Sequence, residues 1–400
     1  MNRLLSKRCL IGIVIVAVLL LPGLAIVKPV NACPPGAKAT WTFALFMNGD
    51  NDLAFCWPEW SLPWLKAVPA SAKVNIVALV SLEDSSRTLV EKISGSSVKV
   101  LKTYEKMDMG ISPTLSWWIN ESTALYPSTY YALTIWDHGY GWNYVSYDEL
   151  FNHTLDMPQL QKAIADSGKK IDVLGFDACN MGNVEVVYQM AKTNLVSYMV
   201  GSEESVPYDG FPYDKMLTKL VRNPAMQPKD FSMAMVDGWG EYYSTQSGPD
   251  YVELNLAAYD VAQMKNTVGI FETWTSDMLA KLPVYRSLYK HALRASYSAY
   301  DTTYFVDMYD LDAHLLAAKG LRDRGLRTAT QNVESSITQY VLNVWNSDDI
   351  SMCKGITLYW GVGDEWEHCG PGWPSGGNYM ETAFSIDTGW GDFLIAYNTR

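Results

Sequence analysis

Short apolar runs that alternate with longer amphipathic stretches constrain the fold of this chain most strongly. Each run is rich in β-branched or aromatic residues and is closed by polar residues or glycine, which is typical of buried strands. The pattern predicts strands at residues 42–47, 74–79, 130–136, 172–176 and 197–200, and helices at 113–119, 157–167 and 183–192. Because strands alternate with helices, we expect an α/β sandwich with a mostly parallel central sheet covered on both faces.

The pattern changes after about residue 222. Residues 230–345 carry helical periodicity, with a possible strand at 251–255. A further strand is predicted at 355–359, and a final helix at 390–397 follows a loop rich in glycine and tryptophan. We therefore expect a catalytic core over residues 38–225 and a mainly helical C-terminal subdomain over 226–400 that completes the fold and adds strands.

The first thirty residues have the layout of a secretory signal peptide. Three basic residues precede an uncharged apolar run over residues 9–27, and small or aliphatic residues at 30–32 permit cleavage before Cys33. We expect a signal peptide over residues 1–32 and a secreted protein. Two alternatives are an uncleaved anchor through residues 9–27 and lipidation of Cys33. No later segment has eighteen uninterrupted apolar residues.

Removing this leader leaves an odd number of cysteines in an exported chain, which predicts one thiol without an intramolecular partner. The five are Cys33, Cys56, Cys179, Cys353 and Cys369. Two local pairs are expected, Cys33–Cys56 and Cys353–Cys369, each contributing about 3 kcal/mol in the chain-entropy model. Cys179 is then the unpaired thiol. The alternative is that all five are reduced and buried.

The charge balance limits the partners of the protein. The formal net charge is -12, which argues against a nucleic-acid-binding surface because such a surface needs a basic face. An acidic surface suits a basic peptide substrate, although acidity also serves solubility. Only 18% of the residues are charged and 48% are apolar, as in a globular chain.

Two predicted strands end in reactive side chains. The strand at 130–136 leads into His138, and the strand at 172–176 leads into Cys179. If these strands are neighbours joined by the helix at 157–167, both tips lie at the carboxyl edge of the sheet, where parallel α/β sheets bind ligands. A thiol nucleophile and an imidazole base would then face each other.

Each of these residues also has a structural explanation. A lone cysteine after an apolar strand is usually a small buried hydrophobe, and a histidine at a strand end is often a hydrogen-bonded loop residue. Because His138 and Cys179 follow predicted strands at equivalent positions of the sheet, we favour a catalytic role for both. The backbone amides of Gly139 and Cys179 would then form an oxyanion hole, and glycine lets a substrate carbonyl approach closely.

The chain resembles the clostripain-like cysteine peptidases, relatives of caspases, gingipains and legumains. The blocks that carry the resemblance are NGDND at 48–52, WDHGYGW at 136–142, GFDAC at 175–179, SEE at 202–204, DGF at 209–211, VDMYDL at 306–311 and WGDFL at 390–394. The likeness covers about residues 40–398, and the His-Gly and Asp-Ala-Cys blocks are its specific part.

The resemblance implies a caspase-like sheet, a His138–Cys179 dyad without a fixed third member, and cleavage of peptide bonds after a basic residue. Basic specificity needs an anion in the pocket, because a buried cation without a partner is costly. Asp177 matches a family position associated with that pocket, and Asp209 is the second candidate. Glu203 and Glu204 are further acids nearby, for which solvated, capping or structural roles are the alternative.

Two features limit what the resemblance implies. Many relatives activate by cutting themselves after a basic residue between the histidine and cysteine strands, but residues 139–161 contain no Lys or Arg. We expect that no processing is required there; cleavage elsewhere or a non-basic preference are the alternatives. Asp50 and Asp52 suggest a calcium site, or a turn that caps the next helix. No cofactor is expected to be required, and no zinc-type spacing of His and Cys is present in the sequence.

The sequence therefore predicts a secreted, monomeric cysteine endopeptidase that acts on polypeptides. A catalytically silent binding protein and a transpeptidase on the same fold are the alternatives. Hydrolysis and transfer share one acyl-enzyme, so the sequence does not separate them.

Overall fold

A nine-stranded sheet forms the centre of the computed structural model, which describes residues 38–300, 302, 304–363 and 378–399. The strands lie in the order β12 (Val341–Asn346), β10 (Asn255–Asp260), β9 (Val196–Gly201), β8 (Ile171–Asp177), β5 (Ser128–Trp136), β1 (Ala39–Gly49), β2 (Val74–Leu82), β3 (Arg87–Ser94) and β4 (Ser97–Glu105). The five strands from β9 to β2 are parallel, and the outer strands on both sides pair antiparallel. The predicted mostly parallel sheet is confirmed.

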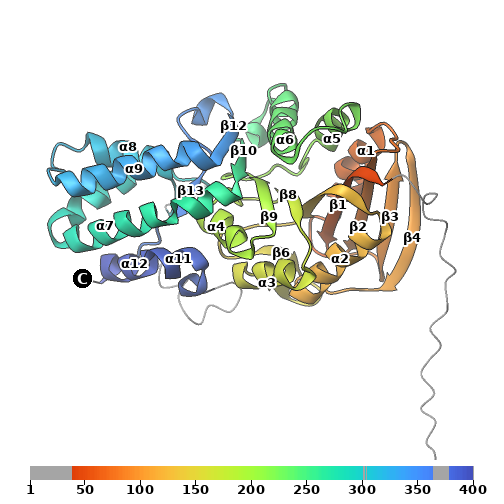
Figure 1. Cartoon of the computed structure of the whole chain (residues 1–400), viewed down its shortest axis with the longest axis horizontal. Coiled ribbons are helices and arrows are strands. Elements are labelled where there is room, and N and C mark those ends of the chain that lie inside the picture. Colours follow the sequence, from red (N-terminus) through yellow and green to blue (C-terminus); the bar gives the residue numbers. More distant parts are fainter. Residues whose placement is uncertain (1–37, 301, 303, 364–377, 400) are drawn as a thin grey trace, which may run out of the picture. The chain divides into compact units, whose positions relative to one another are not determined.

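Helices cover both faces of this sheet (Figure 1). One face carries α2 (Ser112–Leu125), α3 (Met157–Ser167), α4 (Val184–Thr193) and α7 (Val261–Ala295), whose apolar residues share one large core with that face. The other carries α1 (Leu62–Ala67), α5 (Tyr213–Arg222) and α6 (Pro228–Tyr243), which share a second core. A parallel sheet buried on both faces explains why its strands read as continuous apolar runs.

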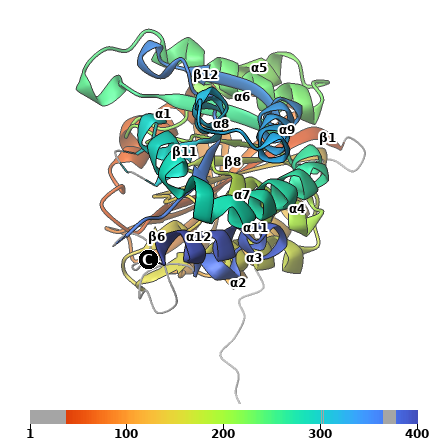
Figure 2. The same cartoon turned by 90° about the vertical axis from the view of Figure 1, so that its left-hand side faces the viewer.

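The second half of the chain completes the same compact unit, which spans residues 38–400. Its strands β10 and β12 extend the sheet begun by the first half. Its remaining elements are α8 (Met308–Ala317), α9 (Arg324–Tyr340), α11 (Ala383–Thr388), α12 (Trp390–Asn398) and the two-stranded sheet of β11 (Phe305–Asp307) and β13 (Thr357–Tyr359). Figure 2 shows these helices stacked beside α7. Short connecting elements are η1 (Trp57–Ser61), η2 (Pro249–Tyr251), η3 (Asp348–Ile350), η4 (Tyr379–Glu381), β6 (Val145–Asp148) and β7 (His153–Leu155).

Helix α3 begins and ends where its sequence predicts. The Asp156 carboxylate accepts a hydrogen bond from the Gln159 amide at 2.8 Å, Pro158 lies in the first turn, and Gly168 ends the helix with a φ of 61°. A capping acid, an early proline and a terminal glycine in the left-handed region are the standard signals of helix ends. This helix links β5 to β8 on one side of the sheet and so makes them parallel neighbours.

Four strands of the central sheet differ from the prediction. The β3–β4 hairpin was missed, since β4 is largely exposed and lacks an apolar run. Strand β12 was read as helical because it follows α9 directly, with no turn residue between them. The strand predicted at 251–255 begins only at Asn255, since Pro249–Tyr251 form a 3-10 turn.

Several expectations fall on residues that the structure does not describe. The signal peptide at 1–32 and the alternative anchor at 9–27 lie outside the described residues, as do Cys33 and Cys369. Among the described cysteines, Cys56, Cys179 and Cys353 form no disulfide with one another. Each of the two predicted pairs includes a cysteine outside the described residues, so both pairs stay predictions. Within the described ranges, no helix combines the length and apolar character needed to cross a bilayer.

Candidate active site

The tips of β5 and β8 meet at the carboxyl edge of the sheet, as the sequence predicts. Trp136 lies opposite Asp177 in the parallel register, and the Asp137 amide donates to the Asp177 carbonyl at 3.3 Å. A Cβ atom on Gly139 would lie 2.5 Å from the Cys179 carbonyl oxygen. The His138–Gly139 segment is therefore packed directly against the Cys179 loop, and only glycine fits at position 139.

Cys179 is covered by the loop that follows β9. Its Sγ atom accepts a hydrogen bond from the Val206 amide at 3.3 Å and lies 3.8 Å from the Val206 carbonyl oxygen, to which the thiol donates. Burial raises the pKa of the Cys179 thiol to about 11, and the charges of Asp177 and Glu204 add to the shift. The thiol is therefore neutral at neutral pH, and attack on a carbonyl requires a base that removes its proton.

The imidazole of His138 contacts a residue from the segment that follows β1. Its Nε2 atom lies 2.8 Å from Oδ1 of Asp52, with 33% of the histidine side chain and 74% of the aspartate side chain exposed. The resemblance predicted a dyad without a fixed third member, so the sequence did not indicate this contact. The sequence signal for it is the NGDND block, in which Asp52 was considered as a calcium ligand or as part of a turn but not as a partner of His138.

The tip of β1 supports the backbone of the histidine segment. The side-chain amides of Asn48 and Asn51 donate to the two carboxylate oxygens of Asp137, at 2.6 and 2.7 Å. The same carboxylate accepts from the His138 amide at 2.6 Å. Asp137 is buried, which raises its pKa, while the hydrogen bonds oppose the shift. Asp137 thus fixes the backbone at His138 to the segment that follows β1.

The two amides expected to form an oxyanion hole are positioned close to each other by the contact of Gly139 with Cys179. In the part of the chain that the structure describes, neither amide donates a hydrogen bond to another residue. Two donors without a protein partner beside a thiol suit a developing oxyanion.

Asp177 is held by the segment that follows the β9 loop. Its carboxylate accepts hydrogen bonds from the Phe211 amide at 3.0 Å and from the Tyr213 hydroxyl at 2.7 Å. Burial raises its pKa to about 7. Gly210, with a φ of 72°, lets the backbone pass the carboxylate, because a Cβ atom there would lie 3.0 Å from Asp177 Oδ1. Both oxygens of the expected pocket acid therefore support this segment.

The other candidate acids are also bound by neighbours. Asp209 Oδ2 accepts from the hydroxyls of Tyr242 and Tyr251, at 2.6 and 3.1 Å. Glu204 accepts from the Tyr297 hydroxyl and from the Tyr300 amide, and burial raises its pKa to about 7. Glu204 thus links the loop over Cys179 to the segment before β11.

Four carboxylates contribute to the pKa of one buried thiol. Burial raises the pKa of Cys56 to about 12, and the further contributions to this shift come from Asp177, Asp52, Glu59 and Asp209. The negative charges of these four acids therefore act on the same region of the protein.

Tyr140, Tyr144 and Tyr300 form an aromatic group. Tyr140 stacks on Tyr144 with ring centroids 6.2 Å apart and meets Tyr300 edge-on at 5.6 Å. Burial raises the pKa of Tyr144 and of Tyr300, and the charge of Cys179 adds to both shifts. The WDHGYGW block thus supplies one ring of this group, which its sequence alone did not reveal.

Asp50 and Asp52 are bound by different partners. Asp50 is buried, accepts from the Ser81 hydroxyl at 2.5 Å and pairs with Lys106, whereas Asp52 pairs with His138. Asn51 Oδ1 accepts from the Leu53 amide at 3.0 Å, which forms a turn before η1. Asn51 therefore forms a turn, and Asp50 and Asp52 each have a protein partner.

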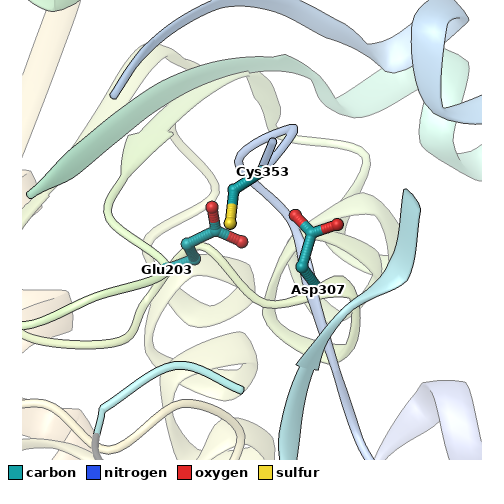
Figure 3. A group of neighbouring side chains, drawn as sticks. All are labelled: Glu203, Asp307 and Cys353. Atoms are coloured by element: carbon teal, nitrogen blue, oxygen red, sulfur yellow. The ribbon is translucent and has the colours of Figure 1, made fainter. Parts of the chain in front are cut away.

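Glu203, Asp307 and Cys353 form the one metal-ligand group found among the described residues (Figure 3). Their ligand atoms lie within 4.8 Å of one another and all three side chains are buried. Burial raises the pKa of Glu203, and the charge of the neighbouring Asp307 adds to the shift. Two buried carboxyl groups this close favour a proton on one of them.

The chain matches the family model described as the clostripain family over residues 47–352. The fold is similar to that of a secreted C11 cysteine protease from Bacteroides thetaiotaomicron, with a TM-score of 0.68 and 17% identity over 88% of this chain and 100% of that chain. An inactive zymogen C11 protease from Parabacteroides distasonis gives a TM-score of 0.67 and 17% identity over 88% and 99% of the two chains. No curated protein matches the chain significantly.

Proposed function

Because the chain belongs to the clostripain family of cysteine endopeptidases, we propose that Cys179 is its nucleophile, that His138 is its general base, and that it cleaves after Arg or Lys. The observation that carries the proposal is the packing of the His138–Gly139 segment against the Cys179 loop at the carboxyl edge of β5 and β8. The sequence resemblance to this family is confirmed, as is the predicted α/β class.

The proposed reaction begins with the neutral thiol. His138 removes the Sγ proton as sulfur attacks the scissile carbonyl carbon, and the carbonyl oxygen accepts hydrogen bonds from the amides of Gly139 and Cys179. The protonated imidazole then gives its proton to the departing amine, which leaves a thioester. Water hydrolyses the thioester. Because Val206 occupies the space around Sγ, its loop moves aside when the substrate binds.

A basic residue at the cleaved position is supported by the charge around the site. The charges of Asp52, Glu59, Asp177 and Asp209 all contribute to the raised pKa of Cys56, and a substrate arginine or lysine that reaches one of these carboxylates would gain a charge-assisted hydrogen bond. Asp209 is the best placed of these acids, since one of its oxygens has no partner among the described residues. Asp177 contributes its charge from a buried position. It also accepts a hydrogen bond from the Phe211 amide, which fixes the segment that carries Gly210.

Secretion is part of the proposal and depends on the leader at residues 1–32. A monomer is expected, with polypeptides as the substrates. We also propose that catalysis requires no cofactor, since the turn at Asn51 accounts for the acidic block without calcium.

The decisive experiment uses the chain from residue 33 onward. Fluorogenic peptides ending in Arg, Lys, Asn or Asp are offered to the wild type, Cys179→Ala and His138→Gln, with an amine acceptor added in a parallel assay. His153→Gln is the matched control, because its ring also pairs with an aspartate, Asp108, yet lies outside the site. We expect cleavage after Arg or Lys that both site variants abolish and the control retains.

The other outcomes are equally informative. Cleavage after Asn or Asp would keep the dyad and refute the assignment of the pocket acids. Activity that survives in Cys179→Ala would refute the dyad. Dominant transfer to the added amine would replace hydrolysis by transpeptidation.

A further inference from the structure

Asp52 has a partner that neither the calcium nor the turn interpretation explains. Its Oδ1 atom lies 2.8 Å from Nε2 of His138. A carboxylate accepts only, so the imidazole donates from Nε2. No other hydrogen bond to this ring is found in the described ranges of the chain. The contact therefore defines which ring nitrogen carries the proton.

The backbone around Asp52 is built to present its side chain. Asn51 accepts from the Leu53 amide and so forms the turn, while its own amide donates to the Asp137 carboxylate and to the Tyr147 carbonyl. Asn48 donates to the same Asp137 carboxylate. The turn after β1 and the segment that carries His138 are thus one hydrogen-bonded unit, and Asp52 extends from that unit beside the ring.

We propose that Asp52 is a positioning residue for His138, an inference that rests on the proposed function. Its carboxylate holds the proton on Nε2 and leaves Nδ1 as the basic nitrogen. In the attack step, Nδ1 takes the proton from Sγ while the Nε2 proton stays on the ring, so the imidazole becomes an imidazolium facing the Asp52 carboxylate. The Nδ1 proton then passes to the departing amine, and the ring returns to its first state.

The exposure of the pair sets the size of the effect. A buried aspartate in this role contributes about 10⁴-fold to kcat, whereas exposed ion pairs contribute up to about 1 kcal/mol. Asp52 is 74% exposed, so water screens its charge. We expect Asp52→Ala to lower kcat about fivefold, which is about 1 kcal/mol at about 1.36 kcal/mol per tenfold. KM should stay unchanged within about twofold, because the residue acts on the base and not on substrate binding.

The kinetic test compares Asp52→Ala and Asp52→Asn with the wild type on the best basic peptide. Asparagine keeps an oxygen acceptor for Nε2 and loses only the charge, so its loss in kcat should be smaller than that of alanine. Asp108→Asn is the matched control, since it removes the charge of the other Asp–His pair and should leave kcat unchanged. A wild-type kcat in Asp52→Ala, or an equal loss in Asp108→Asn, would overturn the proposal.

A spectroscopic test separates this inference from the proposed function. In ¹⁵N-histidine-labelled Cys179→Ala protein, the His138 signals are identified by their loss in the added His138→Gln variant. We expect the Nε2–H tautomer at a pH where the ring is neutral, and a mixture of tautomers once Asp52→Ala is added. A dominant Nδ1–H tautomer would overturn the inference even if the enzyme is active. If no Cys179-dependent cleavage is found, the function fails while this spectrum still decides the role of Asp52.

Discussion

Glu185 is a buried acid outside the catalytic dyad whose raised pKa makes the stability of the fold depend on pH. It lies in the first turn of α4, directly after the loop of Cys179, and has no exposed surface. Oε1 accepts from the Tyr359 amide at 3.1 Å and from the Tyr379 hydroxyl at 2.8 Å, whereas Oε2 has no hydrogen-bond partner among the described residues. Burial raises its pKa from 4.5 to about 7.

The sign of the pH dependence follows from this shift. Between 4.5 and about 7 the folded protein holds a proton that the unfolded chain has lost. Stability therefore falls as the pH rises through this window. A shift from 4.5 to about 7 corresponds to about 3 kcal/mol of lost stability at pH 8 and about 1 kcal/mol at pH 5, at about 1.4 kcal/mol per pH unit.

Glu185→Gln removes this titration and keeps one acceptor oxygen. In a Cys179→Ala background, which prevents self-digestion, we expect its stability relative to the parent to improve by about 2 kcal/mol more at pH 8 than at pH 5. For a folded unit of this size that is about 2–3 °C in Tm, measurable by scanning calorimetry.

The control is Glu149→Gln, an exposed glutamate whose replacement should change the stability by less than about 0.5 kcal/mol at both pH values. Replacing Glu185 also changes the packing contribution to the free energy of unfolding, in either direction. That contribution is the same at both pH values. An equal shift at pH 5 and pH 8, or a larger gain at pH 5, would therefore refute the reasoning.

Three further predictions concern the site. Gly139→Ala places a Cβ atom 2.5 Å from the Cys179 carbonyl oxygen, so we expect kcat/KM on the basic peptide to fall by about 100-fold or more; near wild-type activity would contradict the packing described. Tyr213→Phe removes a hydrogen bond that lowers the pKa of Asp177. The acidic limb of the pH profile of kcat/KM for Arg peptides should therefore move above pH 7. An unchanged profile would show that Asp177 is not part of the pocket. EDTA should leave the rate unchanged within about twofold, because Asp50 is paired with Lys106 and Asp52 with His138; restoration of a lost rate by calcium would show the opposite.

The parallel strands and the active-site edge were predictable because their signals are local. A buried strand reads as an apolar run, and α3 carries its cap, proline and terminal glycine within the sequence of the helix itself. Once β5 and β8 are neighbours, the chain direction alone places His138 and Cys179 at one edge. The exposed hairpin β3–β4 has no such signal and was missed.

The partners of each acid were not predictable, because they depend on contacts between segments far apart in the sequence. Asp52 meets a histidine 86 positions away, and Asp177 meets a hydroxyl 36 positions away. Residue type indicates that a carboxylate needs donors or a cation, but does not identify which loop supplies them. Hence the sequence left calcium and a turn open for the acidic block after β1, and it did not indicate the donors that hold Asp177.

The distribution of these partners separates acids that support the site from acids that act in it. Asp177, Glu204 and Asp209 are buried and accept two protein donors each, so changing them disturbs loops as well as charge. Asp52 is largely exposed and has one hydrogen-bond partner among the described residues. A substitution at Asp52 can therefore alter catalysis with little change in stability. Substitutions at the three buried acids should change stability as well, and thermal stability measured beside kcat/KM distinguishes the two kinds of acid.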